Sequence, residues 1–155
     1  IVAGDVLLEV NTVDVSRSDF DYVMDLLIEA PPPKVSLTLG DGLGTMDMPK
    51  NVLDRLKTKE DAFFVDAVVR QAVREARRNG RLGDLLNVEV IIGAGIQDNG
   101  KRALVRFFAI FSTDGVSSYS CNVSATGERR EDGGIQIISL SCAKDEGLGQ
   151  TFDLI

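Results

Sequence analysis

The side chains in this sequence most capable of covalent catalysis are two cysteines and two serines. Cys121 and Cys142 lie in strand-like runs, and Ser112 and Ser117 lie beside a turn. The sequence contains no histidine, so a serine nucleophile would need a lysine or carboxylate base, and no spacing indicates one. Neither cysteine has a basic sequence neighbour that would lower its pKa. The sequence therefore predicts a non-catalytic protein; the alternative is a small α+β hydrolase or isomerase whose helix and sheet enclose a pocket.

Two further patterns could hold a cofactor or an ion. Gly93-Ala94-Gly95-Ile96-Gln97-Asp98 follows a strand-like run, but an acid takes the third glycine position of a dinucleotide loop. Asn99-Gly100 predicts a hairpin turn where such a loop requires the start of a helix. Asp145, Glu146 and Asp153 do not have the spacing of a calcium loop. We therefore predict neither a cofactor nor a metal site.

A basic cluster near the middle of the chain is the main candidate for partner binding. It gathers five arginines at the end of one predicted helix, in a sequence with a formal net charge of −7: Arg70, Arg74, Arg77, Arg78 and Arg81. Such a cluster can dock an acidic protein surface or anionic lipid. The alternative is that the arginines only complement the negative end of the helix dipole and hydrate the surface.

Composition excludes several classes of function. The 155 residues include 17 basic and 24 acidic side chains, and an acidic chain of this kind lacks the basic surface that nucleic acid requires. No apolar run is long enough to span a membrane. Two cysteines do not form a disulfide scaffold, which favours free thiols in a reducing intracellular compartment. The chain opens at Ile1 in a strand-like pattern, so we expect further sequence upstream.

The C-terminal two thirds predict one α+β domain over residues 58–155. Thr58 is a suitable helix N-cap, an apolar stripe runs to Ala76, and Gly80 is a suitable C-terminal stop. Four strand-like runs follow, near residues 88–92, 104–111, 119–125 and 135–142. A long helix followed by a four-stranded antiparallel meander predicts that the helix stripe covers one face of the sheet. This order resembles the cystatin-like arrangement of a sheet wrapped around a helix.

The first forty residues predict a strand, a helix and a second strand. Residues 6–10 form a short β-type run, apolar residues recur at helical spacing from Phe20 to Ile28, with Ser18 as the expected cap, and residues 35–39 alternate as a strand does. Pro31-Pro32-Pro33 ends the helix. Residues 41–57 are expected to form a linker or a short irregular helix.

The N-terminal residues also resemble the second half of a PDZ domain. In that family a Gly-Asp turn leads a strand into a Val-Asn pair, and a helix and a closing strand follow; here these features are Gly4-Asp5, Val10-Asn11 and the segments just described. Thr12 replaces the glycine that usually follows the asparagine. The resemblance implies that Asp19, Val23 and Leu26 are the remnant of a peptide groove.

The resemblance also implies what would complete this segment. The PDZ carboxylate-binding loop and the strand that pairs with a peptide precede the Gly-Asp turn, so an upstream segment, a partner or the second domain would have to supply the other wall of the groove. We therefore expect an accessory or scaffolding subunit that binds other protein subunits or the surface of a membrane complex. In overall character the chain resembles a peripheral, stromal-side subunit of algal photosystem I, which implies the chloroplast stroma or the thylakoid surface. The alternative is a free-standing PDZ adaptor that binds C-terminal peptides.

Overall fold

Two units make up the computed structural model, which describes residues 2–29, 36–144 and 151–155. The N-terminal unit is Ala3–Gly42 and the C-terminal unit is Leu43–Ile155. Both combine helices with antiparallel sheets, which confirms the predicted α+β class. Three features of the sequence lie outside the described residues: the triple proline at 31–33, Val35, and the acidic pair Asp145-Glu146.

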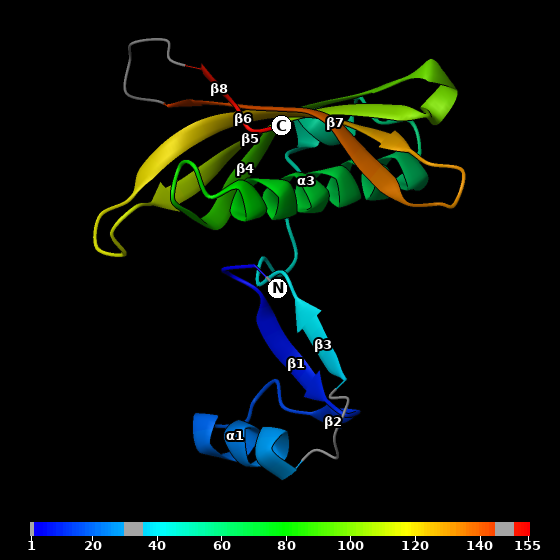
Figure 1. Cartoon of the computed structure of the whole chain (residues 1–155). Coiled ribbons are helices and arrows are strands. Elements are labelled where there is room, and N and C mark those ends of the chain that lie inside the picture. Colours follow the sequence, from blue (N-terminus) through cyan, green and yellow to red (C-terminus); the bar gives the residue numbers. More distant parts are fainter. Residues whose placement is uncertain (1, 30–35, 145–150) are drawn as a thin grey trace. The chain divides into compact units, whose positions relative to one another are not determined.

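The N-terminal unit is a three-stranded antiparallel sheet with one helix (Figure 1). Its elements are β1 (Val6–Val10), β2 (Val13–Asp14), α1 (Phe20–Glu29) and β3 (Leu37–Gly40). The central strand is β1, which pairs with β2 on one side and β3 on the other. The predicted order of strand, helix and strand is present, with β2 as a short addition after the Val-Asn pair.

The turn between β1 and β2 explains why glycine would suit the position of Thr12. Val10 pairs with Val13, so Asn11 and Thr12 form a two-residue hairpin loop. Their φ angles are +47° and +70°, a region that glycine enters freely and a β-branched residue enters only at a cost. Asn11 anchors the turn, because its backbone N–H donates to the carbonyl of Ser36 and its side-chain oxygen accepts from the Ser36 N–H, both at 2.8 Å.

The cap of α1 lies one residue later than the sequence suggested. The carboxylate of Asp19 accepts a hydrogen bond from the backbone N–H of Tyr22 at 2.9 Å, so Asp19 is the N-cap and the expectation for Ser18 was wrong. Both residue types cap well, and Asp19 is the one that directly precedes the first helical residue.

The C-terminal unit begins with a short helix and a long one. The segment expected to be a linker or short helix contains α2 (Lys50–Leu53), and Val52 and Leu56 belong to the core. The long helix is α3 (Lys59–Asn79). The Thr58 hydroxyl accepts from the Asp61 N–H at 3.1 Å, and Gly80 ends the helix with a φ of +68°. Both predicted ends of this helix are confirmed.

Five antiparallel strands follow in a simple meander (Figure 1). They are β4 (Asp84–Gln97), β5 (Arg102–Ser112), β6 (Tyr119–Arg129), β7 (Ile135–Lys144) and β8 (Thr151–Asp153), with a 3₁₀ turn η1 (Asp98–Gly100) between β4 and β5. The four predicted strands are present, and the structure adds β8 at the β7 edge. A three-residue strand carries too little alternation to be recognised in a sequence.

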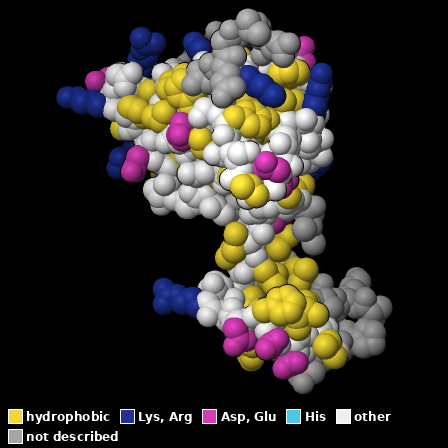
Figure 2. Space-filling view, turned by 90° about the vertical axis from the view of Figure 1, so that its left-hand side faces the viewer, with side chains coloured by type: hydrophobic (Ala, Val, Ile, Leu, Met, Phe, Trp, Pro, Cys, Tyr) yellow, Lys and Arg dark blue, Asp and Glu magenta, His cyan; other side chains and the backbone are white. Residues whose placement is uncertain are grey.

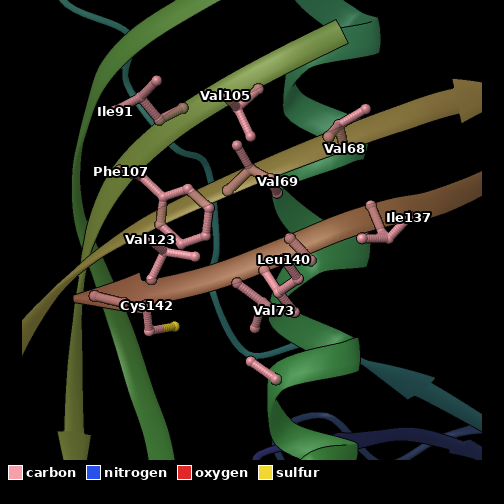
Figure 3. Packing of buried hydrophobic residues seen from close by; sticks show 14 of the residues in the cluster. Val68, Val69, Val73, Ile91, Val105, Phe107, Val123, Ile137, Leu140 and Cys142 are labelled. Atoms are coloured by element: carbon pink, nitrogen blue, oxygen red, sulfur yellow. The ribbon is translucent and has the colours of Figure 1, made fainter. Parts of the chain in front are cut away.

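The core of the C-terminal unit lies between α3 and one face of this sheet. Figure 3 shows Val69 and Val73 on the side of the helix that faces Phe107 of β5 and Leu140 of β7. The helix and the sheet approach closely at Gly127 of β6, where a Cβ atom would lie 2.6 Å from a γ-carbon of Val68. The helix stripe covers the sheet as predicted.

Candidate functional site

The arginine cluster separates into residues with different roles. Arg77 is only 8% exposed, and its Nε donates to the carbonyl of Leu85 at 3.1 Å, so this arginine joins α3 to β4 from within the core. Arg70 pairs through Nε with the Asp66 carboxylate at 2.9 Å and also donates to the carbonyl of Gly44. Arg70 thereby holds the loop before α2 against the helix.

The remaining members lie nearer to solvent. Arg78 pairs with Glu75 at 3.3 Å, and the guanidinium of Arg81 lies 5.0 Å from the centre of the Phe152 ring of β8. Arg74 is half-buried and lies on the same side of the helix as Arg70 and Arg78, because the three are spaced by four residues. The five arginines therefore do not form one surface, and only Arg70, Arg74 and Arg78 share an accessible helix face.

The predicted groove residues of α1 lie on one side of that helix. Val23 and Leu26 are half-buried, and the exposed Asp19 precedes Val23 by one helical turn and Leu26 by two. One oxygen of Asp19 already accepts the Tyr22 N–H. The structure therefore brings the three residues to one face, and the carboxylate of Asp19 also has a structural role there.

A second side of α1 carries the exposed apolar residues that the sequence reasoning missed. We call it the α1 ridge: Phe20, Met24 and Ile28, which are 76%, 37% and 75% exposed. Their spacing of four residues places them in one row along the helix. The sequence does contain a sign of this second apolar side. Seven of the ten residues of α1 are apolar, which is more than one buried helix face requires.

The surroundings of the α1 ridge are acidic. Residues 3–42 contain 8 acidic and 2 basic side chains, a net charge of −6. In the space-filling view a broad hydrophobic surface of the N-terminal unit borders several acidic side chains (Figure 2). Within the part of the chain that the structure describes, the outer edges of β2 and β3 pair with no further strand.

Another apolar surface lies on the C-terminal unit. Phe63 of α3 is 71% exposed and borders a shallow groove of about 350 Å³, whose apolar lining also includes Met46, Met48 and Leu53. Asp47 and Asp66 also line this groove. This surface is the natural comparison for the α1 ridge, because both present an exposed phenylalanine on a helix.

The serine and aspartate groups near the β5–β6 turn form a structural network. Asp114 accepts from the backbone N–H groups of Val116 and Ser117 and from the Ser117 hydroxyl, which lowers its pKa to about 2. The Ser112 hydroxyl donates to the Ser117 carbonyl at 2.6 Å. These bonds order the loop, and an acid with so low a pKa is a weak general base.

The glycine pattern of residues 93–98 forms part of a strand and the turn that follows it. Gly93 and Gly95 lie inside β4, which passes through η1 directly into β5, so no helix follows them and the interpretation as a strand is confirmed. In residues 2–29, 36–144 and 151–155, no three cysteine or acidic side chains lie close enough together to hold a metal ion.

No helix in these same ranges has the length and apolarity to cross a membrane.

Both cysteines are buried in the core of the C-terminal unit, and they are not joined in a disulfide. Cys142 pairs in register with Val123, and Cys121 pairs with Lys144, so the two thiols are offset along neighbouring strands. Burial raises the pKa of the Cys142 thiol from its ordinary value of 9.0 to about 12, with a further contribution from Cys121.

Because the pKa of Cys142 is raised, we expect the free energy of unfolding to fall at alkaline pH. Above pH 9 the unfolded chain releases the Cys142 proton while the folded chain keeps it until about pH 12. The folded state then binds more protons, so its free energy of unfolding falls by up to ~1.4 kcal/mol per pH unit in this window. Urea unfolding of the wild type and of Cys142→Ala from pH 7 to pH 11 tests this. Above pH 9 the free energy of unfolding of the wild type should fall toward that of the variant, which lacks the thiol. Parallel profiles would contradict it.

Comparison with known proteins adds no relative. No protein-family model matches the sequence, and neither a curated protein nor a solved structure matches the chain.

Proposed function

We propose that this chain is a non-catalytic accessory subunit of a larger protein assembly and that its N-terminal unit is the part that a partner binds. The α1 ridge is the observation that carries the proposal. It exposes two large side chains, Phe20 and Ile28, by about three quarters each. Covering such a side chain contributes on the order of 1.5 to 3 kcal/mol, and a contiguous apolar patch rimmed by polar groups is typical of an interaction site.

The open edges of the N-terminal sheet support the same proposal. β2 and β3 each present unpaired backbone groups on one side, within the described residues. Such an edge accepts an additional strand. In the PDZ resemblance, a strand supplied from outside residues 3–42 would likewise complete the groove. The net charge of −6 over residues 3–42 favours a partner with a basic surface.

Co-purification with matched variants tests the proposal. The tagged full-length chain is expressed in its source organism, purified in mild detergent, and its partners are quantified by mass spectrometry. We expect a defined set of partners, and we expect Phe20→Ser/Ile28→Ser to reduce their recovery by about tenfold or more, because two buried side chains are lost. Leu53→Ser/Phe63→Ser removes two exposed apolar side chains from the C-terminal unit and should leave recovery unchanged.

Three outcomes separate the alternatives. Recovery of photosystem I subunits would support the narrower expectation from the sequence, and recovery of another assembly would replace it. Saturable binding of C-terminal peptides alone would favour the PDZ adaptor. A chain that elutes alone would contradict the proposed function.

A further inference from the structure

The sheet face that points away from α3 contains a groove of the C-terminal unit. It measures about 510 Å³. We call it the outer-face groove; its lining includes Arg55, Gly93, Gly95, Leu104, Arg106, Ser124, Thr126, Ser139 and Ser141. None of its side chains belongs to the α1 ridge or to the Phe63 surface.

Strand register places these residues in two rows across four strands. In one row Gly93, Arg106, Ser124 and Ser141 are successive partners. In the other row Gly95, Leu104, Thr126 and Ser139 are successive partners. Each row therefore runs from a glycine on β4 to hydroxyl groups on β6 and β7. In the first row, Arg106 on β5 lies between Gly93 and Ser124.

The glycine of the second row is not required by the fold. Nothing lies within 4 Å of a Cβ atom placed on Gly95, and its φ angle is not positive. A glycine inside a strand lowers stability and marks a bulge or a close approach by a ligand or another backbone. Gly93 follows a register shift, but Gly95 lies in regular register, so the space above it is available to a ligand.

The two arginines of the groove have no protein partner in the described part of the chain. Neither Arg55 nor Arg106 makes an ion pair, a side-chain hydrogen bond or a ring contact there. The same holds for the hydroxyls of Ser124, Thr126 and Ser141. The groove thus gathers two cations and several hydroxyl donors in a protein whose other arginines are largely engaged.

We propose that the outer-face groove binds an oxyanion of phosphate type, carried by a small molecule. Arg106 and Arg55 would bind its charged oxygens, because guanidinium groups donate paired hydrogen bonds to such anions, and the hydroxyls would donate to the remaining oxygens. Asp153 is the register partner of Ser141, and its negative charge favours the Arg106 end of the row for the anion. This site is independent of the partner surface on the N-terminal unit.

Nuclear magnetic resonance of the full-length chain tests this site. Inorganic phosphate and glycerol 3-phosphate are titrated separately at constant ionic strength, with chloride as the reference salt. We expect saturable shifts confined to the Arg106 and Arg55 side chains and the neighbouring Ser124 and Ser141 amides. Arg106→Gln should weaken binding about tenfold or more, while Arg78→Gln, which removes the same charge from α3, should not.

A second variant keeps the test independent of charge. Gly95→Val places a strand-favouring side chain in the open space of the groove, so the fold should be retained while binding of both phosphates is lost. Equal shifts at arginines throughout the chain, binding unaffected by both groove variants, or binding only to anionic lipid vesicles would overturn the proposal.

Discussion

Replacing Phe64 by alanine should lower the free energy of unfolding of the C-terminal unit by ~3 to 5 kcal/mol. The ring is 3% exposed and belongs to the main apolar cluster. The guanidinium of Arg129 lies 4.0 Å from its centre, so the substitution removes a cation–π contact as well as buried area. Urea unfolding followed by circular dichroism measures the change.

The neighbouring residue provides a matched control. Phe63 is 71% exposed, and Phe63→Ala should change stability by no more than ~0.5 kcal/mol, as surface substitutions usually do. The two residues are the same amino acid at adjacent positions of α3, so the two substitutions remove the same atoms. A loss below about 1 kcal/mol for Phe64→Ala, or equal losses for both variants, would show that α3 presents a different face to the sheet.

Gly127→Ala should lower stability by ~1 to 3 kcal/mol, because it overpacks the contact between α3 and β6. Its Cβ atom would lie 2.6 Å and 2.9 Å from the two γ-carbons of Val68, and Val68 is fully buried. The same unfolding measurement applies. Gly95→Ala is the control, since its Cβ atom would have no neighbour within 4 Å.

A double-mutant cycle identifies the cause of this loss. Val68→Ala removes the γ-carbons, so Gly127→Ala should cost less in that background, with a coupling of about 1 kcal/mol or more. An equal cost in both backgrounds would mean that the loss comes from the strand backbone rather than from the contact with the helix.

Much of the C-terminal unit could be predicted because its signals are local. Thr58 and Gly80 marked the ends of α3 through side-chain capping and a left-handed conformation, and Asn99-Gly100 marked the first hairpin. Each depends only on a few adjacent residues. The alternation of apolar and polar residues then identified the strands, since one face of the sheet is buried against α3.

The features that were missed depend on tertiary context. The helix dipole accounts equally well for an arginine in solvent and for Arg77, and only the fold places its Nε against the Leu85 carbonyl. Two adjacent residues could cap α1, and the path of the chain selected Asp19. The α1 ridge could not be identified from the sequence for a similar reason. An apolar residue on a helix does not show which side of the helix is buried or which element packs against it.

Crosslinking from one position tests most directly whether the N-terminal unit is held by a partner. A photoreactive phenylalanine analogue replaces Phe20 in the full-length chain, and in a parallel sample it replaces the similarly exposed Phe63. The proposal predicts that illumination of the native assembly joins position 20 to one defined neighbouring protein and that position 63 gives little or no such product. Absence of a crosslink at position 20, or the same products from both positions, would contradict it.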